Sequence, residues 1–221
     1  MGQTLWTAVD AYISEHISGD DPVLEAAVAA SNAAGLPALN VAPNQGKLLQ
    51  LLARCVGAHR ILEIGTLGGY STIWLARALP ADGHLISLEL DARHAEVARS
   101  NIERAALTER VQIRLGAALD TLPLLQKELE APFCFTFIDA DKANIPEYFD
   151  WAVKLSRPGA MIVVVNVVRK GALIDAHSGD ENVVGVRRLH EALANDQRVS
   201  ATTLQTVGVK GYDGLTLAVV N

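Results

Sequence analysis

The chain has 221 residues, of which 50% are hydrophobic and 20% are charged, and its formal net charge is −6. We expect one α/β domain over 1–221, with a helical N-terminal cap over 1–59 and a core over 60–221. The net acidity argues against nucleic acid as a partner, because affinity for phosphates depends on Lys and Arg. The cysteines have no metal-binding spacing and no apolar run is long enough to cross a membrane, so we expect a cytoplasmic protein without membrane contacts.

The N-terminal cap has a helical pattern. Pro22 and Pro43 stand where the first turn of a helix favours proline. Apolar residues recur at helical spacing in three segments, 5–13, 23–34 and 46–56. Together these segments have more apolar surface than a small sheet needs as cover, so we expect a homodimer.

From residue 60 onward, short apolar runs alternate with longer amphipathic segments, as in successive βα units. The predicted parallel strands are 60–64, 84–90, 111–115, 134–138 and 161–165, and helices are expected to begin near Ser71, Ala92, Leu119, Ile145 and Val183. Two further runs, 199–204 and 214–220, have no helix between them and predict an antiparallel hairpin at one edge. The pattern therefore predicts a doubly wound, Rossmann-like α/β sheet of seven strands, mostly parallel, with an antiparallel edge hairpin. A sheet that ends in such a hairpin resembles the class I methyltransferase fold.

A Gly-rich turn follows the first predicted strand, where 60–71 has the sequence Arg-Ile-Leu-Glu-Ile-Gly-Thr-Leu-Gly-Gly-Tyr-Ser. Glycines let a ligand approach the backbone closely, and the N–H groups of a helix N-terminus face it. The spacing differs from the Gly-x-Gly-x-x-Gly of nicotinamide-binding folds. Glu89 ends the second strand and can accept both ribose hydroxyls, while a carboxylate at Glu63 suits a cationic ligand. We expect S-adenosylmethionine; the alternative is an ordinary turn whose glycines serve only geometry.

Motifs along nearly the whole chain resemble one enzyme family, the small cation-dependent O-methyltransferases that include caffeoyl-CoA and catechol O-methyltransferases and their bacterial relatives. The most specific motif is Phe137-Ile-Asp-Ala-Asp-Lys-Ala-Asn144. The others are the Gly-rich turn, Pro43-Asn-Gln-Gly-Lys-Leu-Leu49, Gly116-Ala-Ala-Leu119, Arg157-Pro-Gly159, Asn166 and Tyr212-Asp-Gly-Leu-Thr-Leu217.

This resemblance implies roles for the residues at matching positions. Lys142 would be the catalytic base, Asp139 a catalytic metal ligand with Asn166 beside it, and Arg187 a contact of the acceptor. The implied cofactor contacts are Val41, Glu63, Gly65, Thr66, Gly69, Ser71, Glu89, Ala118 and Asp139. The implied reaction moves a methyl group from S-adenosylmethionine to a hydroxyl of a small catechol-like or hydroxylated aromatic acceptor.

The sequence departs from the family at its metal site. The family has an Asp-Asn pair at the end of the fifth strand, whereas this chain has Val165 before Asn166. Mg²⁺ or a similar divalent cation gathers about six oxygen ligands, so Asp139 and Asn166 alone are a poor site unless water or Asp141 completes it. We therefore expect weakened or absent metal binding. Either catalysis is impaired, or Lys142 deprotonates the acceptor without a metal.

A second departure follows Asn166, where plant-type members have an aromatic residue and this chain has Arg169 and Lys170. These cations predict an acceptor that carries an acid, unless they are only a solvated loop pair. Two other functions stay open at this point. One is methylation of a hydroxylated nucleobase in tRNA, which the acidity opposes; the other is a cofactor-binding protein with impaired catalysis, which Val165 favours.

Overall fold

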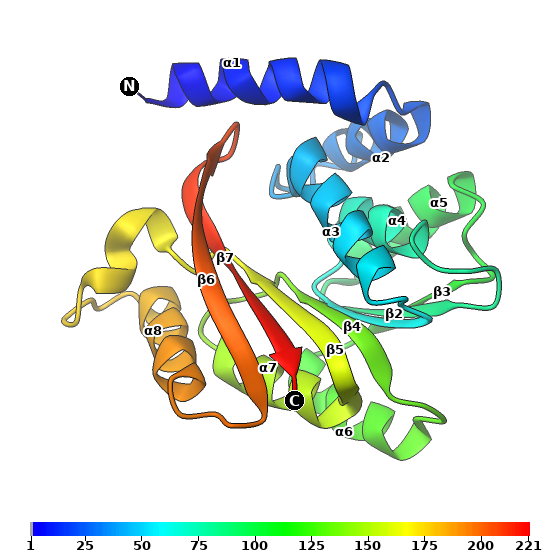
Figure 1. Ribbon diagram of the computed structural model, residues 1–221. Coiled ribbons are helices and arrows are strands. Elements are labelled where there is room, and N and C mark those ends of the chain that lie inside the picture. Colours follow the sequence, from blue (N-terminus) through cyan, green and yellow to red (C-terminus); the bar gives the residue numbers. More distant parts are fainter. Residues whose placement is uncertain (1) are drawn as a thin grey trace.

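The computed structural model describes residues 2–221, and its centre is a seven-stranded sheet of order β3-β2-β1-β4-β5-β7-β6 (Figure 1). The first five strands run parallel, and β7 is antiparallel to both β5 and β6. The strands are β1 (Arg60–Ile64), β2 (His84–Glu89), β3 (Val111–Leu115), β4 (Phe133–Ile138), β5 (Ser156–Val165), β6 (Val199–Gly208) and β7 (Gly211–Val220). The predicted fold class, a mostly parallel doubly wound sheet with an antiparallel edge hairpin, is confirmed.

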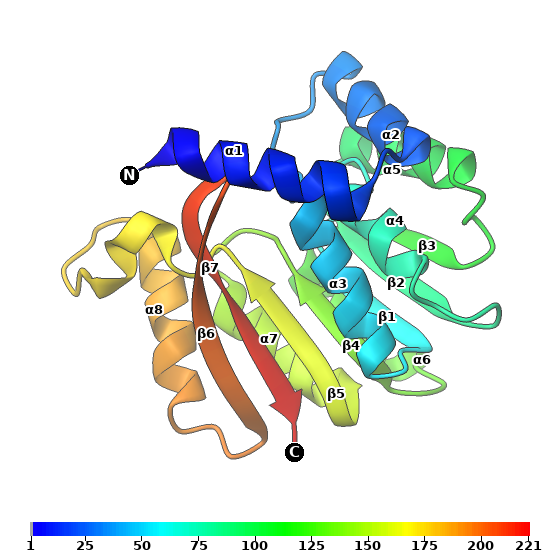
Figure 2. The same cartoon turned by 45° about the horizontal axis from the view of Figure 1, so that its top comes forward.

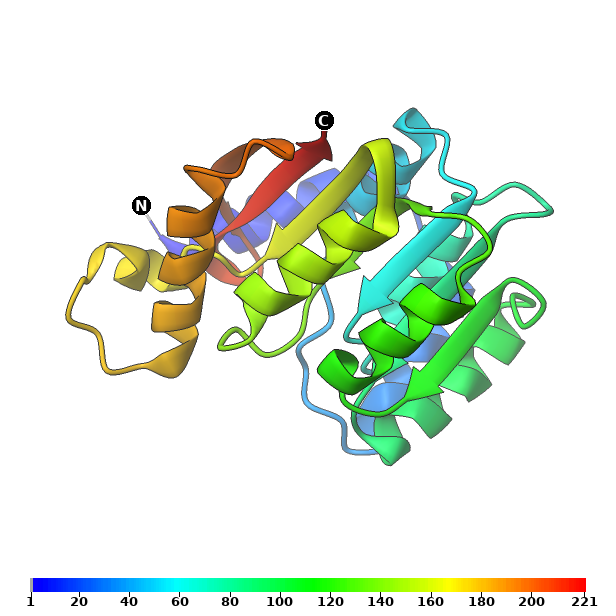
Figure 3. The same ribbon diagram turned by 90° about the horizontal axis from the view of Figure 1, so that it is seen from below.

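Helices cover both faces of the sheet. On one face lie α2 (Pro22–Ala33), α3 (Pro43–Cys55), α4 (Tyr70–Ala76) and α5 (Ala92–Arg104); on the other, nearer the viewer in Figure 3, lie α6 (Ala118–Glu128), α7 (Ile145–Leu155) and α8 (Glu181–Leu193). Aspartates cap several of them: Asp21 accepts from two N–H groups of α2, and Asp91 does the same for α5. None of the helices within 2–221 combines the length and apolarity needed to span a membrane.

The central strands are apolar on both sides because both sides are covered. In β1, Leu62 and Ile64 pack toward α6 and α7, whereas Ile61 packs toward α3 and α4. In β4, Phe135 and Phe137 join the second of these layers, and both are fully buried. The strand order reverses between β1 and β4, so their carboxyl ends form the crevice where open α/β sheets bind ligands.

Three strands are longer than predicted by more than one residue. Strand β5 begins at Ser156 instead of residue 161. Ser156 already pairs with Phe133 of β4, and the register shifts between Phe133 and Phe135. Residues 156–160 include Pro158 and Gly159, and their sequence has no alternating apolar pattern that would predict a strand. The hairpin strands reach Gly208 and Gly211, where cross-strand pairing continues although the apolar alternation has ended.

The first helix, α1 (Gln3–Ile13), lies across the open end of the sheet above the β6–β7 turn (Figures 1 and 2). A π-helical turn, η1 (Ser14–Ser18), continues it. The carboxylate of Asp10 accepts from the N–H of Val209 at 2.7 Å and from the side-chain amide of Asn44 at 2.9 Å. Gln3 donates to the carbonyl oxygen of Gly208 at 3.0 Å. The chain's first helix is thus tied to the turn that precedes its last strand.

Candidate active site

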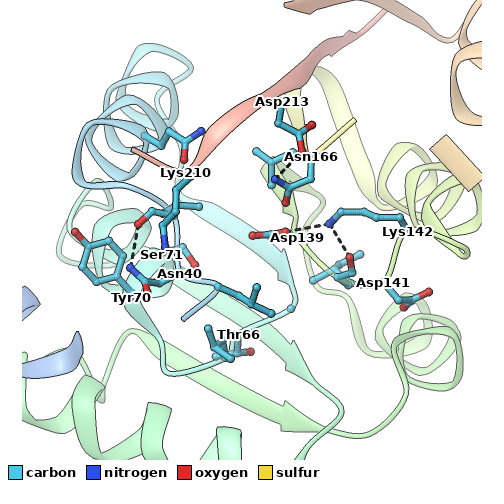
Figure 4. Close-up of a pocket in the computed structure, with 18 of the residues that line it drawn as sticks. Asn40, Thr66, Tyr70, Ser71, Asp139, Asp141, Lys142, Asn166, Lys210 and Asp213 are labelled. Atoms are coloured by element: carbon cyan, nitrogen blue, oxygen red, sulfur yellow. Dashed lines mark hydrogen bonds and ion pairs between the residues drawn. The ribbon is translucent and has the colours of Figure 1, made fainter. Parts of the chain in front are cut away.

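A cleft of about 1160 Å³ lies at the carboxyl ends of β1, β4 and β5, and α1 and the β6–β7 turn contribute to its wall. Figure 4 shows its two sides: Thr66, Tyr70 and Ser71 lie on one, and Asp139, Asp141 and Lys142 on the other. Seven of the predicted cofactor contacts line the cleft: Val41, Gly65, Thr66, Ser71, Glu89, Ala118 and Asp139. Glu63 and Gly69 lie outside it.

The turn after β1 brings the two sides together. Gly65 has φ +95, and a Cβ there would lie 2.2 Å from the carbonyl oxygen of Asp139. The N–H of Asp139 in turn donates to the carbonyl oxygen of Ile64 at 2.9 Å. Only glycine tolerates both this conformation and this approach. Gly69, also left-handed at φ +80, is the N-cap residue of α4 and lies against Ala98.

Glu89 fixes the conformation of this turn. One carboxylate oxygen accepts from the N–H groups of Thr66 at 3.1 Å and Leu67 at 2.8 Å, and the other accepts from the N–H of Asp91 at 2.9 Å. The side chain lines the cleft and is 7% exposed. A carboxylate has about four acceptor positions, so capacity remains for a hydroxyl of a bound ligand.

Glu63 lies behind the cleft wall, in a cage of hydroxyl groups. Its carboxylate accepts from Ser71 Oγ at 2.6 Å, Thr72 Oγ1 at 2.5 Å and Ser87 Oγ at 2.7 Å. Burial raises the pKa of Glu63 to about 7, although the three hydroxyls favour the ionised form. Ser71 lines the cleft and Glu63 does not, so Glu63 fixes the orientation of a hydroxyl in the cleft wall.

On the other side, Asp139 follows β4 and forms an ion pair with Lys142. The ammonium nitrogen of Lys142 lies 3.0 Å from Asp139 Oδ1 and 2.7 Å from the carbonyl oxygen of Ala140, as Figure 4 shows. Lys142 is only 6% exposed. The structure therefore places a buried cation, already held by two oxygens, in the wall of the cleft.

The neighbouring carboxylates are also bonded. Asp141 accepts from the hydroxyl of Tyr148 at 2.5 Å and from the backbone and side chain of Asn144 at 3.1 and 2.7 Å. Burial and the Asp141 carboxylate raise the pKa of Tyr148. Asp213 Oδ1 accepts from the N–H groups of Val168 and Arg169 at 2.9 and 3.0 Å, and its Oδ2 lies 3.5 Å from Asn166 Nδ2.

Comparison with known proteins identifies the family. A sequence model described as O-methyltransferase matches residues 14–220. The chain belongs to the O-methyltransferase family. A catechol O-methyltransferase of Niastella koreensis is 53% identical over 220 residues, which cover 100% of each chain. The predicted family and enzyme class, an O-methyltransferase, are thereby confirmed.

Solved structures of similar proteins agree. The O-methyltransferase of Bacillus cereus in complex with SAH is 56% identical with a TM-score of 0.98, and the match covers 99% of this chain and 100% of that one. The O-methyltransferase TomG of Streptomyces achromogenes, involved in tomaymycin synthesis and solved in complex with SAM, is 52% identical with a TM-score of 0.97. That match covers 100% of this chain and 99% of TomG.

The metal site that the resemblance implies does not fit this O-methyltransferase. Val165, at the position of the missing carboxylate, lines the cleft with an apolar side chain that is 6% exposed. Asp139 is paired with Lys142, and Asn166 is directed at Asp213. Within residues 2–221, no group of three or more His, Cys, Asp or Glu residues is arranged to hold a metal ion.

The two arginines predicted to contact the acceptor differ in position. Arg169 lines the cleft, and its Nε is buried without a hydrogen-bond partner among the described residues. Its φ of +55 begins a left-handed run through Lys170, which Asp213 stabilises by accepting from the Arg169 N–H. Arg187 lies outside the cleft and donates to the carbonyl oxygen of Leu173 at 2.7 Å, so it supports the segment η2 (Arg169–Ile174) that carries Arg169.

Several lining residues were missed by the sequence analysis: Asp10, Asn40, Tyr70, Lys210 and Asp213. Lys210 donates to the carbonyl oxygen of Ala38 at 3.1 Å, and burial lowers its pKa. Asp213 carried a signal, because it stands in the Tyr-Asp-Gly motif near the C-terminus. Asp10 and Lys210 carried none, since only the folded chain brings α1 and the hairpin turn to the cleft.

Proposed function

We propose that this O-methyltransferase binds S-adenosylmethionine beside Gly65, Thr66, Ser71 and Glu89, and transfers its methyl group to a hydroxyl of a small catechol-like or hydroxylated aromatic acceptor beside Lys142. The observation that carries the proposal is the junction of Gly65 with Asp139, which joins a polar turn and a buried ion pair in one cleft. The catechol O-methyltransferase name of a relative and the SAM and SAH complexes of similar structures support it.

The chemistry of the cofactor suits the first half of the cleft. S-adenosylmethionine carries a sulfonium and an ammonium; the carboxylate of Glu89 lines this half of the cleft, and that of Asp139 lines the opposite side. Ribose hydroxyls are donors, for which Glu89 has acceptor capacity left. The hydroxyl of Ser71, oriented by Glu63 at 2.6 Å, is a further polar contact. Val41 and Ala118 supply apolar wall for the adenine.

Methyl transfer is an in-line displacement, so the protein has to hold the acceptor oxygen opposite the sulfonium and favour its anionic form. The Lys142 ammonium lies in the opposite wall, where it attracts that oxygen electrostatically. Asp139 and Ala140 fix its position through their hydrogen bonds. The helix α1, held to Val209 through Asp10, contributes to the wall of the cleft and so limits the access of water.

A direct test incubates the protein with methyl-labelled S-adenosylmethionine and a panel of catechols, and measures labelled product and S-adenosylhomocysteine. We expect O-methylated catechol. Calorimetric titration with S-adenosylhomocysteine measures cofactor binding separately. Binding without turnover on any acceptor would support a cofactor-binding protein with impaired catalysis, and transfer of label to tRNA would support the nucleobase alternative.

We further propose that the acceptor carries a carboxylate recognised by Arg169. Arg169 brings a positive charge to the lining of the cleft, and a guanidinium pairs well with a ligand carboxylate. In an Arg169→Ala variant, we expect the preference for 3,4-dihydroxybenzoate over catechol, measured as a ratio of kcat/KM, to fall about tenfold or more. Lys170→Ala is the matched control, because Lys170 is exposed and outside the cleft. An unchanged ratio in Arg169→Ala would reject this acceptor class.

The homodimer also remains a proposal. Apolar side chains are exposed on α1 and on the hairpin beside it, among them Leu5, Val9, Tyr12, Leu204 and Val207. Exposed apolar side chains that gather on one face favour association with another protein surface. Light scattering on the unmodified chain and on a Val9→Lys variant tests it: we expect a dimer and a weakened dimer, and a monomeric parent would reject the proposal.

A further inference from the structure

The acceptor half of the cleft has carboxylates, but their hydrogen bonds leave little for a metal ion. Asp139 is paired with Lys142, and Asp141 receives donors on both oxygens, from Tyr148 and from Asn144. On Asp213, three backbone N–H groups converge on one oxygen, those of Val168, Arg169 and Gly214. A divalent cation needs about six oxygen ligands, most of them free to turn toward it. A cation here would have to displace several of these bonds.

Val165 makes the position beside Asn166 unsuitable as well. Its side chain packs in the apolar layer that contains Phe137 and Leu215, and it lines the cleft from there. An isopropyl group offers no lone pair to a metal ion, and its apolar surface is unfavourable for the water that a coordination shell needs. The chain thus lacks a charged ligand at the position before Asn166.

Lys142 supplies a positive charge in the same wall. An ammonium has three N–H donors, and the structure uses two of them, toward Asp139 and Ala140. The third is available to an acceptor oxygen in the cleft. Because the side chain is 6% exposed and cannot swing freely, this charge is fixed before the acceptor arrives.

We propose that this protein transfers methyl groups without a divalent cation, and that the Lys142 ammonium, held by Asp139 and Ala140, is the cation beside the acceptor oxygen. The inference rests on the proposed function. The acceptor hydroxyl loses its proton to water, and Lys142 keeps its own protons. A lone pair of the anionic oxygen then forms the new O–C bond while the C–S bond breaks, and that electron pair stays on sulfur, which becomes neutral.

The acidity of the acceptor then controls the rate, because no metal lowers its pKa. A nitrocatechol, whose hydroxyl ionises more easily, is expected to react faster than catechol at neutral pH. For each acceptor, kcat/KM should rise with pH and level off near the pKa of that acceptor in water. Addition of Mg²⁺ should leave both profiles unchanged. A pH profile that is the same for both acceptors would contradict the proposal.

Binding of Mn²⁺, followed by the electron paramagnetic resonance signal of the free ion, tests the metal directly. We expect no binding by the unmodified protein in the range where the Val165→Asp variant binds, with at least about a tenfold difference in affinity. Val165→Ile is the matched control and should behave as the parent. Micromolar binding by the unmodified protein would overturn the proposal, and this result needs no variant to fold.

Turnover in the presence of a chelator gives the second readout. The unmodified protein should methylate its acceptor equally well with the chelator and with added Mg²⁺, and a loss of turnover in the chelator would overturn the proposal. Absence of turnover under both conditions would instead reject the proposed function and the role of Lys142 in it. In that case the Mn²⁺ titration still decides the metal question by itself.

Discussion

The two halves of the cleft are built in different ways. In the cofactor half, Glu89 bonds to backbone N–H groups of the turn and Glu63 bonds to three hydroxyls, so each carboxylate holds the protein's own framework in place. In the acceptor half, Asp139 holds the ammonium group at the end of the long Lys142 side chain, and the apolar Val165 lines the same cleft. A change in the acceptor half should therefore alter turnover while it leaves cofactor affinity nearly intact.

The largest expected effect comes from the residue shared by both halves. Gly65→Ala places a Cβ 2.2 Å from the Asp139 carbonyl oxygen in a left-handed conformation, so the turn and β4 must separate. We expect loss of turnover and of cofactor binding, and a decrease of about 3 kcal/mol or more in the free energy of unfolding. Gly57→Ala is the control, because Gly57 is also left-handed but has open space around it. Urea unfolding should show a loss of only about 1 kcal/mol there.

The next largest effect is expected from replacing Lys142, which should change turnover without changing cofactor affinity. Lys142→Met should lower kcat by about 10²-fold or more, because the positive charge beside the acceptor oxygen is lost. The dissociation constant of S-adenosylhomocysteine, measured by calorimetry, should change little. Lys142→Arg keeps the charge and should recover part of the rate. Equal losses of kcat and of cofactor affinity in Lys142→Met would contradict the division into two halves.

The buried carboxylate of the cofactor half predicts a pH dependence of stability. The pKa of Glu63 is about 7 in the folded protein and lies near 4.5 when exposed, so the folded state binds the proton more tightly. The resulting stability is fully present below pH 4.5 and is lost as the pH rises through 7, by about 3 kcal/mol. Glu63→Gln should remove this component from urea unfolding curves between pH 5 and 8. Glu25→Gln, at an exposed position of α2, should retain it.

The smallest effect concerns closure of the cleft. Asp10→Ala removes the acceptor for the Val209 N–H and the Asn44 amide, so it should cost about 1 to 2 kcal/mol of stability. Because Asp10 lines the cleft and holds α1 to the β6–β7 turn, we expect KM for the acceptor and for the cofactor to rise together. Glu15→Ala, at an exposed position just after α1, is the control. A selective rise for one substrate would mean that α1 serves only one half.

Local patterns in the sequence were sufficient to predict the sheet, because each central strand is a short apolar run that ends at a turn or an acid. The start of β5 was missed since its first residues pair with β4 through backbone groups, which any side chain permits. In the site, the family resemblance indicated Asp139, Lys142 and Asn166, and the structure brings all three to the cleft. Asp139 and Asn166 stand directly after β4 and β5, whose carboxyl ends meet at one edge of the sheet.

Other parts of the site depend on three-dimensional packing that no local pattern records. Glu63 belongs to the predicted turn, yet its side chain points into the interior, and Ser71 occupies the wall in its place. Arg187 lies on α8 outside the cleft and donates to Leu173, in the segment that carries Arg169. Asp10 gains its role from Val209, which is 199 positions distant in the chain.

That last contact also bears on how the chain folds. The helix α1 is synthesised long before its anchors at Gly208 and Val209, because Asp10 and Val209 lie 199 positions apart in the chain. Closing so long a loop carries a large entropic cost until the sheet between its ends has assembled, so α1 docks late in folding. The same reasoning makes this contact an early one to open in the native protein. Hydrogen exchange at the N–H of Val209 would therefore report the opening of the cleft before any unfolding of the sheet.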